Sequence, residues 1–237
     1  MKNHKFSSKF SKFALGALIA ASITSSAVAV NLDGFFVGAE GKYNFKSQIK
    51  SGWGDATEAY KFDADDSLFA LGLKVGYDFD LWRVYGAINH NFEAKDSLAV
   101  VGPALGLPIL EELKWSGNDF VLGADWTPKF NLAGLDFKAI LGAFAGISKI
   151  DVKYFAQDGA DTMTSDYSQD GFIYGLKLGG IYQINQNNEI EFGLKYDKAK
   201  YDDKNIALNM SGTLAPMTAK DTKRTNLGVF VGYNYKF

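Results

Sequence analysis

The sequence predicts an all-β fold, an eight-stranded antiparallel up-and-down transmembrane β-barrel. Three observations lead to this prediction. Apolar residues alternate with small or polar residues in eight segments, the connections between segments alternate between short and long, and aromatic residues stand at both ends of the apolar faces. Such strands separate lipid on one side from a packed polar interior on the other.

The first segment shows the period of two most clearly. Phe35, Val37 and Tyr43 share one side of the expected strand, while Glu40 and Lys42 share the other. A strand of about 12 residues rises roughly 40 Å and, tilted by about 45°, covers roughly 28 Å, which matches an apolar band about 25 Å tall. Each segment can therefore cross a membrane once. The eight apolar faces lie within residues 35–45, 69–79, 82–92, 120–126, 135–147, 172–182, 190–196 and 227–237.

The N-terminus predicts a signal peptide over residues 1–29, followed by a single barrel domain over residues 30–237. Four lysines come first, then an apolar stretch at 13–21, then a small-residue cleavage site at Ala27, Val28 and Ala29. The apolar stretch is about half of the ~20 residues that a membrane-spanning helix needs. We therefore expect export through a cleaved signal peptide rather than a helical anchor.

Charge and cysteine content exclude several function classes. The chain has 25 basic and 27 acidic residues, and cleavage after Ala29 would remove four lysines and no acid. The mature chain is therefore acidic, which disfavours a general nucleic-acid binder. With no cysteine, the chain has neither a disulfide framework nor a cysteine-based metal site. We expect no cofactor and no metal.

The connections predict the orientation. Short connections rich in Gly, Pro, Asn or Asp lie at 78–81, 128–134 and 185–188, and long ones lie at about 46–66, 93–116, 150–170 and 198–222. In a bacterial outer-membrane barrel the short turns face the periplasm, and the long loops face outward. The sequence therefore predicts four long outer loops.

A soluble barrel such as a lipocalin also alternates, but it turns its apolar face inward around a ligand. Here the polar face carries many glycines, among them Gly38, Gly72 and Gly76, as a crowded interior favours. The apolar face ends in two aromatic girdles, which belong at two membrane interfaces. The expected periplasmic girdle is Phe35, Phe79, Trp82, Trp126, Phe137, Tyr182, Phe192 and Phe237, and the outer one is Tyr43, Phe45, Phe69, Phe92, Phe120, Phe172 and Tyr196.

These features together resemble the small outer-membrane β-barrel family that includes the outer-membrane protein A barrel and the opacity-type surface proteins. The resemblance rests on the cleavage site, the eight segments, the four long loops and the ending Tyr233-Asn234-Tyr235-Lys236-Phe237. It implies a bacterial (Gram-negative) outer-membrane location, contact with lipid and lipopolysaccharide, and an assembly signal at Tyr233, Tyr235 and Phe237 that the barrel-assembly machinery reads. Because no further domain follows the last strand here, we expect no cell-wall tether.

The inward face is expected to hold charges of both signs. Eight strands leave an interior that side chains just fill, so we expect a polar network that plugs the lumen. Pairing Phe35 with Phe79 would place Glu40 opposite Lys74. The expected network is Glu40, Lys42, Lys74, Arg83, Lys177, Glu191 and Lys195, joined by Asp125, Asp136, Lys138, Arg224 and Lys236.

A plugged barrel favours a structural or surface-interaction role, in adhesion or envelope integrity. A narrow porin-like channel for small solutes is the first alternative, and a barrel enzyme that modifies lipid A is the second. Hydrolase chemistry needs a nucleophile beside a base that an acid orients. His90, the only histidine after residue 29, falls on the lipid face, and Ser97 falls in a loop. We therefore expect no enzyme.

The outer loops are the expected place for any host or surface ligand. The acidic loop at 150–170 fits no calcium-binding spacing. The loop at 98–110 is apolar, which is typical of a contact site or of a segment that folds over the barrel mouth or against lipid. The loop at 198–222 is either a generic polar loop or a contact for lipopolysaccharide phosphates through Lys198, Lys200, Lys204, Lys220, Lys223 and Arg224.

Overall fold

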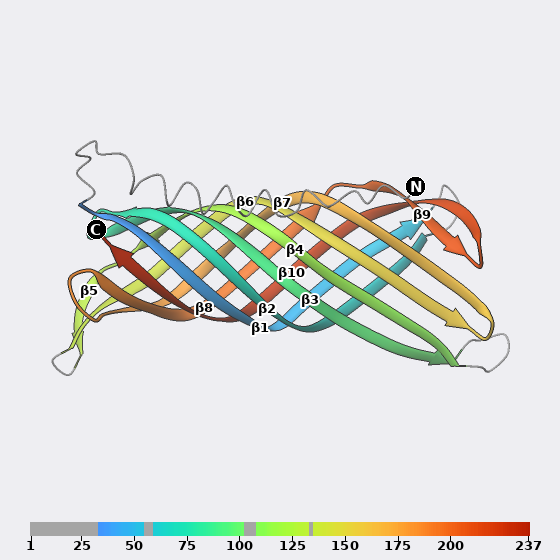
Figure 1. Ribbon diagram of the computed structural model, residues 1–237, viewed down its shortest axis with the longest axis horizontal. Helices are drawn as coiled ribbons and strands as arrows, with labels where there is room; N and C mark the ends of the chain where they lie inside the picture. Colours follow the sequence, from blue (N-terminus) through green and yellow to red (C-terminus); the bar gives the residue numbers. More distant parts are fainter. Residues whose placement is uncertain (1–32, 55–58, 102–107, 133–134) are drawn as a thin grey trace, which may run out of the picture. The chain divides into compact units, whose positions relative to one another are not determined.

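The computed structural model describes residues 33–54, 59–101, 108–132 and 135–237, and the predicted signal peptide lies outside this part of the chain. Residues Gly34–Phe237 form one compact unit (Figure 1). Its strands are β1 (Phe35–Gly54), β2 (Ala59–Asp78), β3 (Trp82–Val101), β4 (Pro108–Trp126), β5 (Lys129–Leu132), β6 (Leu135–Asp158), β7 (Asp161–Gln183), β8 (Asn188–Tyr201), β9 (Lys204–Met210) and β10 (Thr213–Lys236).

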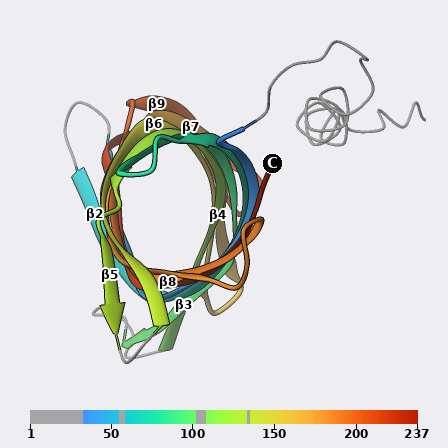
Figure 2. The ribbon, with the colours of Figure 1, turned by 90° about the vertical axis from the view of Figure 1, so that its left-hand side faces the viewer.

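Eight of these strands close into a ring in the order β1-β2-β3-β4-β6-β7-β8-β10, and β10 pairs with β1 (Figure 2). All pairings are antiparallel, which confirms the predicted eight-stranded up-and-down barrel. The two short strands are additions. β5 forms a small hairpin with β6 at the short-turn end, and β9 forms one with β10 at the other end.

The predicted register between β1 and β2 is wrong by two residues. Phe35 lies opposite Tyr77 instead of Phe79, and Glu40 lies opposite Gly72 instead of Lys74. The alternation fixes which side chains share a face, and a shift by two residues leaves every face unchanged. The sequence pattern therefore determined the facing of the strands but not their exact pairing.

The part of the barrel between the aromatic girdles is apolar outside and charged inside. Leu122 is 75% exposed and Leu176 is 61% exposed, whereas Lys177, next to Leu176, is 2% exposed. Soluble monomers rarely expose apolar patches of more than a few hundred Å², and here the apolar surface continues over all eight strands. A barrel wall of this kind belongs in lipid.

No helix in the described residues is long and apolar enough to cross a membrane.

The strands are much longer than a membrane requires. A 20-residue strand such as β1 rises about 68 Å, and at a tilt of about 45° it covers roughly twice the apolar band. Much of what we expected as outer loop is therefore paired strand. We call this part, beyond the outer girdle, the outer extension; it comprises 46–54, 59–68, 92–101, 108–118, 149–158, 161–171, 198–201, 204–210 and 213–222.

The interior of the outer extension is mostly apolar, with a few buried polar side chains such as Ser51 and Thr222. In β1, Lys42 and Asn44 point inward, a bulge lies between Asn44 and Ser47, and above it Ile49 and Trp53 are buried inside. A bulge adds one residue to one strand and so exchanges its two faces. β3 has a similar irregularity between Asn91 and Ala94. Beyond these bulges the barrel interior is packed with apolar side chains, as in the core of a soluble protein.

One seam of the outer extension is not closed by a strand ladder. The pairing of β2 with β3 ends where Ala70 meets Asn91, although both strands continue outward with their other partners. Backbone N–H groups of Asp65 and Lys95 instead donate to carboxylates on the facing strand, at 3.2 and 3.0 Å. The β1–β2 and β3–β4 hairpins diverge at this end (Figure 1).

Candidate functional site

Buried ion pairs fill the barrel interior at membrane depth, and this network is the candidate site. Three layers follow one another from the short-turn end outward, and we call them the turn-side, middle and outer-side layers. Every strand of the ring contributes to them, because the inward positions of each strand carry polar residues at this depth. The described acidic members are Glu40, Asp78, Asp119, Asp125, Glu189, Glu191 and Asp197, and the basic ones are Lys42, Lys74, Arg83, Lys138, Lys177, Lys195, Arg224 and Lys236.

The turn-side layer is centred on Asp78 at the end of β2. Arg83 places Nη2 2.8 Å from Asp78 Oδ2 and 2.6 Å from Glu189 Oε2. The Nζ atoms of Lys236 and Lys138 lie 2.9 and 3.3 Å from the same Asp78 oxygen. Asp78 therefore holds three cations from β3, β6 and β10 across the lumen.

The middle layer has two acceptors that each face more than one lysine. Lys195 Nζ lies 2.7 Å from Glu40 Oε1, and Lys74 Nζ lies 4.0 Å from Glu40 Oε2 while also contacting Glu191. Lys177 Nζ lies 3.5 Å from Glu191 Oε1. Strands that are not neighbours in the ring, β1 with β8 and β2 with β8, are thus joined through the lumen.

Aromatic rings and a further carboxylate fill the spaces around the middle layer. Lys177 Nζ is 3.0 Å from Asp125 Oδ2 and stands 5.2 Å from the ring centre of Tyr85 and 5.1 Å from that of Phe230. At such distances a ring face attracts a cation. The rings therefore stabilise the buried ammonium group and occupy the space that water would otherwise take.

The outer-side layer joins β1, β4, β8 and β10. Arg224 Nη2 lies 2.8 and 2.9 Å from the two carboxylate oxygens of Asp119, and Lys42 Nζ lies 2.8 Å from Asp197 Oδ2. Asn91 and Ser148 also donate to Asp119, at 2.7 and 2.6 Å. This layer is the last polar one before the apolar interior of the outer extension.

A small cavity lies in the interior at the middle layer. The cavity found there, beside Glu40, Lys74 and Lys195, measures about 10 Å³. A water molecule needs a cavity of about 10–15 Å³ in such terms. The space is therefore at the lower limit for one water molecule and far below what a passing solute would require.

A second closure lies in the outer extension, where an apolar core fills the barrel. Trp53 and Trp115 are its largest members, 4% and 1% exposed. Trp53 Nε1 donates to the Tyr167 hydroxyl at 3.0 Å, and Trp115 Nε1 donates to Ser47 Oγ at 3.2 Å. We did not predict this core from the sequence, because we expected loops there. The feature that could have revealed it is the spacing of two residues between inward side chains after the bulge, as from Ile49 to Ser51 to Trp53.

The structure brings the lumen residues named from the sequence together. Glu40, Lys42, Lys74, Arg83, Lys177, Glu191 and Lys195 are all buried inside the barrel and ion-paired. The side chain of Asp136 lies outside the described residues. Sequence analysis missed Asp78, Asp119, Glu189 and Asp197, although each shares the strand face of an inward residue that it named.

From the sequence, Arg224 was expected both among the inward charges and among the loop residues that contact lipopolysaccharide; the inward position is confirmed, and the loop contact is wrong. Its side chain points inward and is fully buried against Asp119, because position 224 belongs to the inward face of β10. Of the apolar segment 98–110, the backbone forms strand at 98–101 and 108–110, and its side chains lie outside the described residues. A role for this segment stays a prediction.

The residues of the expected assembly signal lie on the outer face of β10. Tyr233, Tyr235 and Phe237 are 38–47% exposed, and the backbone N–H of Phe237 donates to Phe35 O at 3.0 Å. The Tyr233 hydroxyl contacts Asn188. These aromatic side chains therefore stand where the last strand meets the first, and their reading by an assembly machinery stays a prediction.

His90 lies away from the inward charges. Its Nδ1 atom is 2.9 Å from Asn118 Oδ1, and its ring stands edge-on to Phe92 at 4.9 Å between centres. Ser97 is exposed, further out on β3. The geometry places neither residue beside the carboxylates of the lumen.

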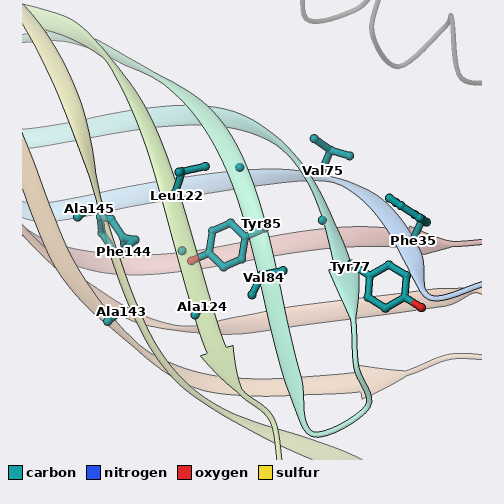
Figure 3. Close-up of a pocket in the computed structure, with 13 residues that line it drawn as sticks. Phe35, Val75, Tyr77, Val84, Tyr85, Leu122, Ala124, Ala143, Phe144 and Ala145 are labelled. Carbon is teal, nitrogen blue, oxygen red and sulfur yellow. The ribbon is translucent and has the colours of Figure 1, made fainter.

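A groove of about 770 Å³ marks the lipid-facing wall over β2, β3, β4 and β6 (Figure 3). Its floor is made of small outward residues such as Gly86, Ala124 and Ala143, and its rims include Val75 and Leu122. The described lining is apolar apart from the Tyr hydroxyls. The groove is thus part of the apolar outer wall of the barrel.

No protein-family model matches the chain, and no curated protein sequence matches it. Several solved structures are similar. The outer membrane protein OprG from Pseudomonas aeruginosa has a TM-score of 0.46 and 16% identity, over 86% of this chain and 96% of that one. Ail, the attachment invasion locus protein of Yersinia pestis, in complex with the heparin analogue sucrose octasulfate, has a TM-score of 0.41 and 16% identity, over 84% of this chain and 98% of that one. Neisserial surface protein A has a TM-score of 0.37 and 16% identity, over 86% and 97%.

Proposed function

We propose that this protein is an integral β-barrel of the bacterial outer membrane with a sealed lumen and a structural or surface-interaction role. The observation that carries the proposal is the series of buried ion pairs that crosses the lumen, in which Arg83–Glu189 and Asp119–Arg224 join strands on opposite sides of the ring. A barrel closed in this way has no open path for solutes through its lumen, so its function would depend on its outer surface and its lipid contacts.

Several features support the outer-membrane location. The closed ring with an apolar belt is the β-architecture that satisfies all backbone groups in lipid. The predicted signal peptide exports the chain, and the terminal aromatic residues of β10 are suited to recognition by the barrel-assembly machinery. In this orientation the short turns face the periplasm, and the outer extension stands at the cell surface, where host or surface ligands would meet it.

The energetics of the network favour a seal over a narrow channel. Removing one partner from a buried ion pair costs about 3–5 kcal/mol, because the other charge remains buried without compensation. Glu40, Asp78 and Glu191 each face at least two cations. A conducting state would have to separate several such contacts at once, which makes spontaneous opening rare.

Two alternatives receive less support. A channel would be favoured by an interior of one charge sign, whereas acidic and basic residues are nearly balanced here. An enzyme that modifies lipid A would need a base beside a nucleophile. The only histidine after residue 29 faces outward next to Phe92.

Single-channel recording of the refolded protein in a planar bilayer tests the seal. We expect at most small and rare conductance steps from the wild type. Glu40→Ala should raise their frequency, because it deprives Lys195 of its 2.7 Å partner and Lys74 of one of two carboxylates.

Asp63→Ala is the matched control, since it removes an ion pair with Lys50 that is about half exposed on the outside. The control should behave as the wild type. Large and stable steps from the wild type would overturn the sealed-lumen proposal and promote the channel.

A further inference from the structure

Three lysines form a row across neighbouring strands on the outside of the barrel. Lys50 of β1 lies directly opposite Lys223 of β10, and Lys223 lies directly opposite Lys200 of β8. All three occupy outward positions, because their neighbours in sequence, such as Ile49, are buried inside. Side chains opposite one another on antiparallel strands are about 4.5–5.5 Å apart at Cβ, so the Cβ atoms of the three lysines lie within roughly 10 Å.

The row stands just above the lipid-facing belt. On β10 it lies four residues beyond the outward Leu227, and on β8 Lys198 and Lys200 follow the girdle residue Tyr196. Four residues rise about 14 Å along a strand, or roughly 10 Å along the membrane normal at a tilt of about 45°. Lysine stems bend toward the interface and keep the ammonium in the polar layer. The charges therefore reach the depth of lipid head groups.

Within the described residues, the chain supplies an ion-pair partner to only one lysine of this row. Lys50 pairs with Asp63 at 2.8 Å, but within the described residues neither Lys223 nor Lys200 has a carboxylate in ion-pair range. Like charges directly opposite one another destabilise a sheet. Their repulsion is relieved when an anion binds between them.

A second lysine row on the other side of the barrel shows what a self-neutralised row looks like. Lys95, Lys114 and Lys153 are likewise opposite one another on β3, β4 and β6. There Glu112 lies 2.5 Å from Lys95 and 2.7 Å from Lys114, and Asp166 lies opposite Lys153. The hydrogen bonds from Lys114 and Lys95 hold the pKa of Glu112 below its ordinary value. Two carboxylates thus face the three lysines of this row, whereas the first row has Asp63 alone.

We propose that Lys50, Lys223 and Lys200, with Lys198 beside them, form a binding site for the phosphorylated head group of a glycolipid in the outer leaflet. The inference rests on the proposed outer-membrane location and orientation. Each ammonium offers three hydrogen-bond donors, and charge-assisted bonds to phosphate oxygens are roughly twice as strong as neutral ones. A head group with more than one phosphate matches a row of several cations better than a single point charge would.

Lipid titration of the purified barrel tests the site. The probes are lipid A with both phosphates and lipid A with its phosphates removed, and bound lipid is counted by native mass spectrometry. The triple variant K198Q/K200Q/K223Q is compared with the control K95Q/K114Q/K153Q, which removes the same number of lysines from the self-neutralised row. Both sets lie on the outer face of the barrel, and heat-modifiable mobility verifies folding.

We expect the triple variant to bind phosphorylated lipid A at least about tenfold more weakly than the wild type, since each lysine near an anionic lipid surface contributes roughly a factor of five. The control should stay within about twofold, and lipid without phosphates should bind all three proteins alike. Equal binding of phosphorylated lipid by the triple variant and the wild type would overturn the site.

Inorganic phosphate at the same phosphate concentration distinguishes the sources of the anion. It should compete weakly, because it lacks the acyl chains that place the head group at the row. Full displacement of lipid by free phosphate would overturn a lipid-specific site. A barrel that binds the lipid but conducts ions would refute the sealed lumen and leave this site standing.

Discussion

At the residue scale, one peptide bond separates two environments. In β2, Leu73 is 54% exposed on the outer face, while Lys74, its neighbour, is 7% exposed and holds two carboxylates inside. At the outer position a charged side chain would find lipid and no polar partner. At the inner position an apolar side chain would take one cation away from Glu40 and from Glu191. The strand therefore tolerates different substitutions at adjacent positions.

We predict that Leu73→Arg lowers the free energy of unfolding by about 2–4 kcal/mol, because it places a cation at membrane depth on the lipid side. Leu214→Arg is the matched control, since Leu214 is 68% exposed but belongs to the β9–β10 hairpin of the outer extension. Its cost should be within about 0.5 kcal/mol. Denaturant titration in lipid bilayers measures both values, and equal costs would contradict the assigned membrane boundaries.

Sequence analysis could assign inward and outward residues because period two fixes them. Glu191 and Lys195 followed from the apolar face of Ile190, Phe192 and Leu194 alone. The same reasoning would have found Asp197, had the inward face been followed past Lys195. The alternation pattern could not predict which charges form ion pairs. Lys74, for example, contacts Glu191 on a strand that is not its neighbour in the ring, and a contact across the lumen has no counterpart in the spacing of residues along the chain.

At the element scale, the strands continue where loops were expected. In β1 the inward face changes from even-numbered to odd-numbered residues at the bulge between Asn44 and Ser47. A prediction that assumes one uninterrupted alternation therefore ends the strand at this point. β6 keeps its parity over 24 residues, but its inward residues change from a mixed set at membrane depth, such as Lys138, Ile140 and Gly142, to apolar ones further out, such as Ile150 and Val152. Between the girdles the outer face meets lipid and is apolar. In the outer extension the outer face meets water, so the apolar residues lie on the inner face, and the pattern of a lipid-facing strand no longer applies.

The last strand closes the ring, and its end makes a further prediction. The backbone N–H of Phe237 donates to Phe35 O, and Tyr235 stands edge-on to Phe237 at 5.2 Å between ring centres. We predict that deletion of Phe237 strongly reduces insertion into the outer membrane. The deletion weakens the seam between the last and first strands, where unpaired backbone groups cost several kcal/mol each in lipid. It also removes the terminal residue of the expected assembly signal.

Membrane fractionation with heat-modifiable mobility measures the yield of inserted barrel. Phe237→Tyr, which keeps the aromatic ring and the backbone, should insert normally. Normal insertion of the shortened chain would contradict the role given to the terminal aromatic residue.

At the scale of the whole molecule, one barrel combines two kinds of interior. Ion pairs hold the membrane-embedded part together, whereas apolar packing around Trp53 and Trp115 holds the outer extension together. The two parts also differ in closure, since the β2–β3 ladder ends where Ala70 meets Asn91. The outer extension therefore has fewer ladder bonds to lose, and we expect it to open before the membrane-embedded part does.

Trp115→Ala separates the two parts. Removing a buried Trp side chain costs about 3–5 kcal/mol, and this loss falls within the outer extension, where Trp115 is 1% exposed and bonded to Ser47. We predict faster amide hydrogen exchange in 61–69 and 92–97, on the two sides of the open seam, with unchanged protection between the girdles.

The control is Trp126→Ala, at the lipid-facing rim near the short turns, where Trp126 is 39% exposed and belongs to neither interior. It should leave exchange in the outer extension unchanged. The lumen should stay closed to ions in Trp115→Ala, because the buried ion pairs remain. Large conductance steps from this variant would assign the seal to the apolar core instead, and equal loss of protection throughout the barrel would show that both interiors unfold as one unit.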